Sequence, residues 1–191
     1  MKSLTNYINE KLIVNKNYNP YTYAPKSFDE LRKIIEDRYN KLGPGTEQDP
    51  IDFNDIDVSN LDSFCNKNKG IFAETKFKYI DISYWDVSNA VSTRNMFYEC
   101  DELKSVGNIS DWDISNVRST RNMFYGCDKL ESIGDISGWD VSKVTDMSYM
   151  FAFCKKFNQD ISNWDVSKVK FKIDMFDKCS IKYKYKPKFK I

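Results

Sequence analysis

The sequence predicts an α/β repeat solenoid, a short array of strand-plus-helix units with a capping helix at its N-terminus. Tryptophans recur at intervals of 27, 27 and 25 residues, and each opens the sequence Trp-Asp-(Val/Ile)-Ser. A Met-Phe pair begins 11 residues after each tryptophan, and a cysteine stands 15 residues after it. A fixed period of this length is typical of a supersecondary unit that stacks on copies of itself. We therefore expect a binding or scaffold surface and no catalytic pocket.

Each repeat contains two kinds of segment. The stretch Asp-Ile-Ser-x-Trp-Asp-Val-Ser is rich in β-branched residues and predicts a short strand with a bend. In one unit Val144, Met147, Met150 and Cys154 then follow at the spacing of a helical face. One short strand and one short helix per repeat is the leucine-rich-repeat pattern. We place about five such units at residues 51–180, the first of them degenerate.

A non-repetitive segment precedes the array. Residues 1–26 are an N-terminal extension and linker, with a short helix expected over residues 2–14. Residues 27–50 hold the capping helix and a loop, and this helix is expected over residues 28–42. It begins with a capping box, Ser-Phe-Asp-Glu, and ends at Gly43.

Residues 181–191 alternate lysine with aromatic and other residues, and two interpretations remain open. In the favoured one, the segment is a basic strand whose tyrosines pack on the last unit and whose lysines discourage edge association. In the other, it is a flexible tail that binds nucleic acid or an anionic surface. Without this segment the chain carries 24 basic and 28 acidic residues.

Composition excludes several classes of protein. Hydrophobic residues make up 41% of the chain, enough for a core, and the net charge of +1 indicates no global attraction to polyanions. No segment approaches the roughly 18 to 20 apolar residues of a membrane span. The first residues lack the apolar region of a secretory signal, which leads us to expect a cytoplasmic protein.

Residues 139–167 read Trp-Asp-Val-Ser-Lys-Val-Thr-Asp-Met-Ser-Tyr-Met-Phe-Ala-Phe-Cys-Lys-Lys-Phe-Asn-Gln-Asp-Ile-Ser-Asn-Trp-Asp-Val-Ser. This motif resembles the repeat of the BspA-like leucine-rich-repeat surface proteins of bacteria. The resemblance implies a non-catalytic protein-binding module, with an adhesin-like protein of the cell surface as the alternative. The opening residues also resemble the start of small phage-encoded proteins, which implies a phage-associated module or a virion setting.

Positions that stay the same in every repeat are expected to build the stack. They form a structural ladder of tryptophans and free, buried cysteines: Trp85, Trp112, Trp139, Trp164, Cys100, Cys127, Cys154 and Cys179. A stacking platform for ligands at the tryptophans, and a disulfide or metal role for the cysteines, are the less favoured alternatives. Positions that differ between repeats are the candidates for contact with a partner: Tyr84, Arg94, Asp111, Arg121, Tyr149, Asn163 and Lys172.

The residue types argue against an enzyme. The chain has no histidine, which excludes Ser-His and Cys-His nucleophile pairs and histidine metal sites. It has no phosphate-binding loop and no dinucleotide fingerprint. The repeated aspartates Asp86, Asp113, Asp140 and Asp165 suggest either a calcium ladder or, as we favour, turns in which each aspartate bonds the backbone two residues on. We therefore expect no cofactor, no metal and no small-molecule substrate, and a protein partner in preference to nucleic acid.

Overall fold

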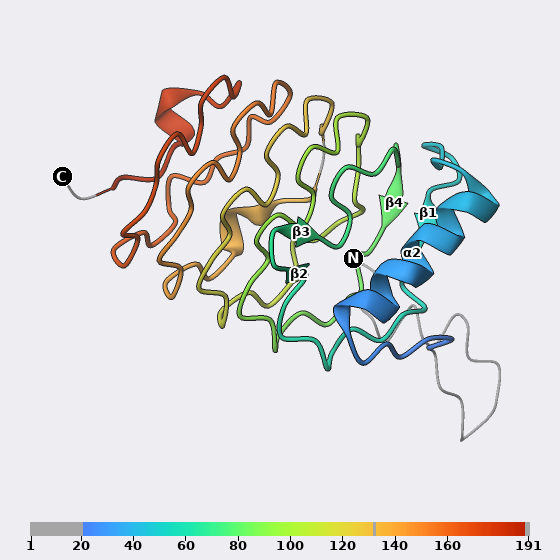
Figure 1. Cartoon of the computed structure of the whole chain (residues 1–191). Coiled ribbons are helices and arrows are strands. Elements are labelled where there is room, and N and C mark those ends of the chain that lie inside the picture. The colour runs from blue at the N-terminus through green and yellow to red at the C-terminus, as the bar shows by residue number, and fades with distance from the viewer. Residues whose placement is uncertain (1–20, 132, 190–191) are drawn as a thin grey trace.

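Successive layers of chain follow one another from helix α2 (Phe28–Leu42) to the C-terminal end in the computed structural model (Figure 1). The structure describes residues 21–131 and 133–189. The helix expected over residues 2–14 therefore lies outside the described residues, as does most of the N-terminal extension. We call each repeat-length turn of the chain a layer.

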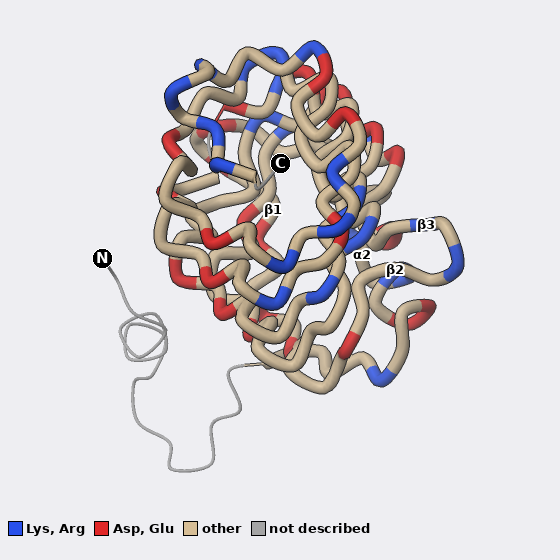
Figure 2. Tube along the Cα trace, turned by 90° about the vertical axis from the view of Figure 1, so that its left-hand side faces the viewer, with Lys and Arg blue, Asp and Glu red and all other residues tan. Residues whose placement is uncertain are grey.

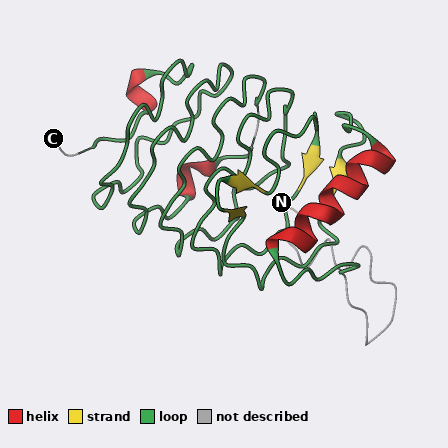
Figure 3. Cartoon of the chain, viewed as in Figure 1, coloured by secondary structure: helices red, strands yellow, loops and turns green. Residues whose placement is uncertain are grey.

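The expected α/β repeat solenoid is wrong. The described residues contain one α-helix and two sheets of two strands each, and no helix or strand recurs from repeat to repeat. The stretches expected as strands and short helices consist mostly of turns and irregular chain (Figure 3). Single parallel bridges join equivalent positions of neighbouring layers, as between Ser92 and Ser119 and between Ser119 and Asp146.

The regular elements are short. Strand β1 (Ile51–Asp52) pairs in parallel with β4 (Ile80–Asp81). Strand β2 (Cys65–Asn66) forms an antiparallel hairpin with β3 (Lys69–Gly70). Two short 3₁₀ turns lie in the later layers: η1 (Ile136–Gly138) and η2 (Tyr183–Tyr185).

Hydrogen bonds between layers explain why no helix forms after each tryptophan. In residues 147–154 the odd-numbered amides donate to carbonyls of the next layer, over 2.8 to 3.0 Å. The even-numbered amides from residue 150 onward donate to carbonyls three residues back. An α-helix needs every amide to donate four residues back. Moreover, Tyr149 and Phe153 have φ angles of 59° and 64°, outside the right-handed helical region. The apolar spacing that suggested a helix belongs to a series of turns.

Columns of identical side chains fill the interior. The phenylalanines of the Met-Phe pairs stack ring on ring, with centroids 5.2 Å apart between Phe97 and Phe124 and 5.5 Å apart between Phe124 and Phe151. The four tryptophans are 3% to 5% exposed. Each indole Nε1 donates to a backbone carbonyl of the preceding layer, over 2.9 to 3.2 Å. The ring is thus buried while its one polar group stays bonded, as a buried tryptophan requires.

The cysteines form a second column beside the phenylalanines. All five cysteines of the described residues are free thiols. The Sγ atoms of Cys100, Cys127 and Cys154 donate to carbonyls of the preceding layer over 3.0 to 3.1 Å, and these three side chains are at most 1% exposed. Cys179 is half-buried and its Sγ lies 3.8 Å from the carbonyl of Phe157.

Helix α2 covers the first layers, and its predicted bounds are confirmed. The Oγ of Ser27 accepts from the amide of Glu30 over 3.2 Å. Gly43 ends the helix with φ at 77°, and its amide donates to Tyr39 over 2.7 Å. The buried residues Leu31 and Ile35 face the core.

The C-terminal segment is not the expected strand. Tyr183 to Tyr185 form the 3₁₀ turn η2, and Tyr183 is 91% exposed instead of packed. The segment still contacts the later layers, because the carbonyl of Tyr185 accepts from the amide of Ile161 and Asn158 Oδ1 accepts from the amide of Lys182, both over 3.0 Å. Tyr185 is partly buried against the core, so of the two tyrosines only Tyr185 packs as expected.

Close packing of layers predicts a strong effect at Gly70. A Cβ atom there would lie 1.7 Å from the carbonyl oxygen of Asn95 in the next layer, so the backbones would have to separate. We expect Gly70→Ala to lower the free energy of unfolding by about 3 kcal/mol. The control is Gly138→Ala, where no atom lies within 4 Å of the new Cβ; it should change stability by less than about 0.5 kcal/mol. Denaturant unfolding measures both, and equal effects would contradict the layer contact.

Thiol accessibility provides a second test. Burial raises the pKa of Cys100 to about 11 and raises the pKa of Cys127 and Cys154 well above the usual value. At pH 8 these three thiols should therefore react with a disulfide reagent only after denaturation, because the thiolate is the reactive form. Half-buried Cys65 should react first in the native protein, and Cys65→Ser should remove this phase. Rapid modification of all five thiols at pH 8 would rule out the buried column.

Candidate interaction surfaces

Aspartate-serine turns shape the surface beside each tryptophan. The Oδ1 atoms of Asp86, Asp113, Asp140 and Asp165 each accept from the serine amide two residues on, over 3.0 Å. The favoured turn interpretation is therefore confirmed. The serine donors lower the pKa of Asp113 and Asp140. Within residues 21–131 and 133–189, no group of three or more acidic, histidine or cysteine side chains is placed to hold a metal ion.

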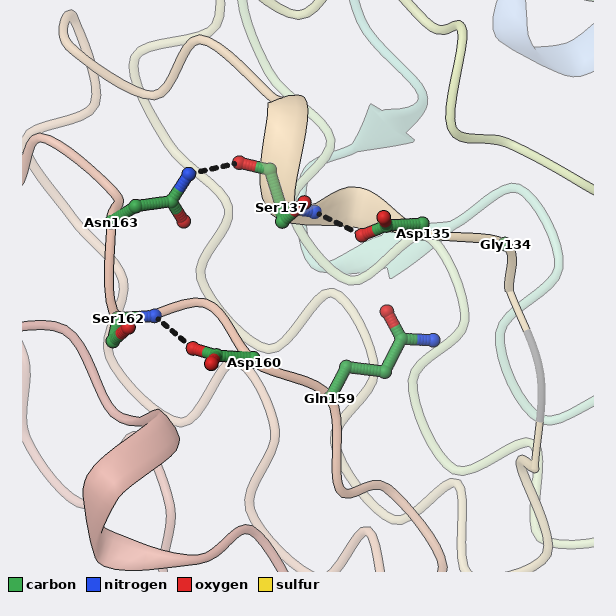
Figure 4. Close-up of a pocket in the computed structure, with 7 residues that line it drawn as sticks. All are labelled: Gly134, Asp135, Ser137, Gln159, Asp160, Ser162 and Asn163. Carbon is green, nitrogen blue, oxygen red and sulfur yellow. Dashed lines mark hydrogen bonds between the residues drawn. The ribbon is translucent and has the colours of Figure 1, made fainter.

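An open cleft of about 750 Å³ lies next to these turns in the later layers (Figure 4). Its polar side chains already bond one another or the backbone. Asp135 and Asp160 accept from the amides of Ser137 and Ser162 over 3.0 Å, and these bonds lower the pKa of both carboxyl groups. Both carboxylates of the cleft are therefore hydrogen-bond acceptors of local turns. The lining residues are Gly134, Asp135, Ser137, Gln159, Asp160, Ser162 and Asn163.

The candidate residues that precede the tryptophans follow one edge of the molecule. Tyr84 is half-buried, and its amide donates to Asn54 Oδ1 over 2.8 Å. Asp111 is exposed. Asn163 is exposed at the cleft, where its Nδ2 donates to the carbonyl of Ser137 over 3.0 Å (Figure 4). These three residues differ in charge and size.

The other candidate residues follow the tryptophans in the sequence, and the structure brings only some of them into contact. The guanidinium of Arg121 lies over the ring of Tyr149, 5.5 Å from its centroid. Arg94 occupies the equivalent position one layer earlier, where its Nη2 lies 3.4 Å from Asn68 Oδ1. Lys172 lies at the C-terminal end instead, with its Nζ 4.6 Å from the centroid of Phe189.

Tyr149 is not the equivalent of the two arginines. The amide of Asn95 bonds the carbonyl of Arg121, and the amide of Asn122 bonds that of Ser148. Tyr149 therefore takes the position of Asn95 and Asn122, all three with positive φ.

Sequence reasoning missed a column of half-buried rings on the same surface. Tyr98 and Tyr125 stack with centroids 5.0 Å apart and planes 9° from parallel. The next layer has Ala152 at the equivalent position, and two other rings cover Tyr125 in its place. Phe153 and Tyr149 lie 5.2 and 6.3 Å from it, both edge-on. The sequence contains a sign of this column, because a tyrosine directly follows Met-Phe in two repeats.

These residues define a surface that we call the aromatic–arginine face: Arg94, Tyr98, Arg121, Tyr125, Tyr149 and Phe153. All six side chains are partly exposed. Burial, with a smaller contribution from Glu99, raises the pKa of Tyr98 to about 12, so its hydroxyl is a neutral donor at physiological pH. Tyrosine and arginine held rigidly on a surface are the residues that most often anchor protein partners.

The comparison with known families gives one match. Residues 102–186 match the model of a family described as a Mycoplasma protein of unknown function, DUF285. This family is associated with BspA-like repeat proteins. The match therefore supports a general resemblance to repeat proteins of this kind. The matched region contains Arg121, Tyr125, Tyr149 and Phe153, and ends just before Pro187.

No curated protein and no solved structure matches the chain. None of the helices in the described part of the chain is long and apolar enough to cross a membrane.

The contact between Arg121 and Tyr149 predicts a measurable coupling. In a double-mutant cycle with Arg121→Ala and Tyr149→Ala, we expect a coupling of about 0.5 to 1 kcal/mol in the free energy of unfolding, the usual value for an exposed cation–π pair. The matched cycle pairs Arg94→Ala with Tyr149→Ala, which lie two layers apart, and should be additive. Equal coupling in both cycles would show that the effect does not come from this contact.

Proposed function

We propose that the chain is a non-catalytic, protein-binding module of the BspA-like repeat type, and that it binds its partner through the aromatic–arginine face. The observation that carries this proposal is the continuous contact from Arg121 over Tyr149 to Tyr125 and Tyr98. The DUF285 match at residues 102–186 supports the family part of the proposal.

Preorganisation makes this face suited to binding. Each ring is held by a neighbour from another layer, so little side-chain freedom is lost when a partner docks. Arg94 Nη2 lies 3.4 Å from Asn68 Oδ1, and Arg121 Nη1 lies 4.0 Å from Asp146 Oδ2. Both contacts are long, so a partner that offers backbone or carboxylate oxygens can supply closer acceptors to these guanidinium groups, whose charged bonds are the stronger kind.

A non-catalytic role agrees with the way the polar groups are used. The aspartates beside the tryptophans bond serine amides, and the buried cysteines bond backbone carbonyls. The aspartates fix turns within a layer, and the cysteines bond one layer to the preceding one. They are not poised to transfer protons or to attack a substrate.

Site-specific photo-crosslinking tests the proposal. A photoreactive phenylalanine analogue in place of Tyr125 should capture a protein from the native host, whereas the same analogue in place of exposed Asp113 should not. The captured protein, once purified, should bind Arg121→Ala/Tyr125→Ala at least about tenfold more weakly than the parent chain, as expected for interface anchors.

The double variant must first unfold at a temperature that shows an intact fold. Unchanged affinity in a folded double variant would refute the aromatic–arginine face as the binding surface.

A further inference from the structure

Between the turn segments that hold the Met-Phe pairs, the hydrogen bonds from layer to layer run in one direction, although the amides of Thr145 and Lys170 just before two of these segments donate the opposite way. The amides of Tyr149, Phe151 and Phe153 donate to carbonyls of residues 173, 175 and 177. The same alternation recurs one layer earlier, where the amides of Asn122 and Phe124 donate to residues 148 and 150. The remaining amides and carbonyls close turns within their own layer. Each segment thus donates to the layer after it and accepts from the layer before it.

This direction leaves unpaired carbonyls at the first layer, and helix α2 supplies their partner. By register, the carbonyls of Ile71 and Ala73 are the ones that would accept from an earlier layer. The Nη1 of Arg32 lies 2.8 Å from the first and 3.2 Å from the second, and 3.2 Å from the carbonyl of Gly70. A cation therefore closes the carbonyl end of the stack.

The last layer carries the complementary feature. Asp174, Phe176 and Lys178 hold the positions of Tyr149, Phe151 and Phe153, and the φ angles of 47° at Asp174 and 51° at Lys178 match that register. Among the backbone hydrogen bonds of the described residues, none uses the amide of these three. We call these three amides the donor row. The carbonyls of residues 173, 175 and 177 already accept from the preceding layer, so this edge offers donors only.

The surroundings of the donor row are strongly basic. Residues 168–191 hold nine lysines and two aspartates, whereas the rest of the chain holds 20 basic and 26 acidic residues. Figure 2 views the molecule from this end, and lysine and arginine positions gather around the C-terminus there. Phe171 and Ile173, which precede the row in the sequence, are each 56% exposed, and Lys186 Nζ of the C-terminal segment lies over the ring of Phe176, 5.2 Å from its centroid.

We propose that the donor row binds an acidic peptide segment of a partner protein. One layer earlier, the equivalent amides of Tyr149, Phe151 and Phe153 meet the alternate carbonyls of residues 173, 175 and 177, and a partner segment can offer alternate carbonyls in the same way. Glutamate or aspartate side chains of that segment meet the lysines, and its apolar residues meet Phe171 and Ile173. The edge has no free acceptor, so the segment fits best where its facing residues are proline, which has no amide proton.

Other occupants fit less well. A second copy that presented its own donor row would place donors against donors, and α2 with Arg32 covers the opposite end of the stack. Nucleic acid and anionic membranes would use the lysines but not the regular spacing of the amides. This inference shares with the proposed function only the class of partner, because it uses a different surface.

Fluorescence anisotropy with labelled peptides tests the inference on the full chain. The probe is a ten-residue peptide of alternating glutamate and proline, and its control has lysine in place of glutamate. We expect the acidic peptide alone to bind, and its affinity to fall as salt rises from 50 to 300 mM. Absence of binding by the acidic peptide at 50 mM salt would overturn the proposal.

A single-atom change separates the donor row from general charge attraction. Replacing the backbone amide of Phe176 by an ester, through incorporation of the hydroxy acid, removes one donor and leaves every side chain in place. It should weaken the acidic peptide about tenfold and leave binding of a 20-nucleotide oligo(dT) unchanged. An ester at Lys178 is the second variant, in case the first does not fold.

Two further results would overturn the proposal. Unchanged peptide affinity in both folded ester variants, or tighter binding of oligo(dT) or of phosphatidylserine vesicles than of the peptide, would overturn the proposal. The variant Arg121→Ala/Tyr125→Ala should retain peptide binding. Failure of the donor row and failure of the aromatic–arginine face can therefore be told apart.

Discussion

The hydrogen bond from an amide of one layer to a carbonyl of the next is the interaction on which the rest of the structure depends. It fixes the register between layers, and that register places Phe97, Phe124 and Phe151 in one column and the buried thiols in another. It also uses only every second amide. The remaining amides close turns, so neither a continuous strand nor a helix can form along the same stretch.

Local sequence signals predicted the parts of the fold that local chemistry decides. Ser27, Glu30 and Gly43 gave the bounds of α2, because a cap and a left-handed stop act within a few residues. The aspartate-serine turns followed from the same kind of reasoning, since an aspartate reaches the amide two residues on whatever surrounds it.

The layers themselves could not be read correctly from apolar spacing. Apolar residues spaced three and four apart in the sequence are compatible with a helix and also with a series of turns whose side chains enter one core. The residue type at positions of positive φ was a partial signal. Asn95, Asn122 and Gly126 stand there, and asparagine and glycine adopt this conformation most readily. Tyr149 and Phe153 stand at equivalent positions in the next layer and gave no such sign. For the C-terminal segment, a period of two predicted a strand, but its turn at η2 depends on the end of the preceding layer.

The candidate residues fall into two groups: those that hold the layers together and those that lie on the surface. Trp112 and Cys127 are committed to carbonyls of an earlier layer, and so they are structural. Arg121 and Tyr149 were found by their departure from the repeat, but their contact was not, because they stand at different repeat positions, nine and ten residues after their tryptophans. Tyr125 was missed because it repeats, and its partial exposure becomes clear only once the layers are placed.

The two ends of the stack have different evolutionary freedom. Arg32 ties α2 to particular carbonyls, so a repeat inserted at that end would have to recreate a matching guanidinium contact. A repeat duplicated just before residue 181 would meet the amides of Asp174, Phe176 and Lys178 already in the correct register, and would present the same amides in its turn. Gene duplication can therefore lengthen this protein from its C-terminal side while the helix that starts the stack remains unchanged.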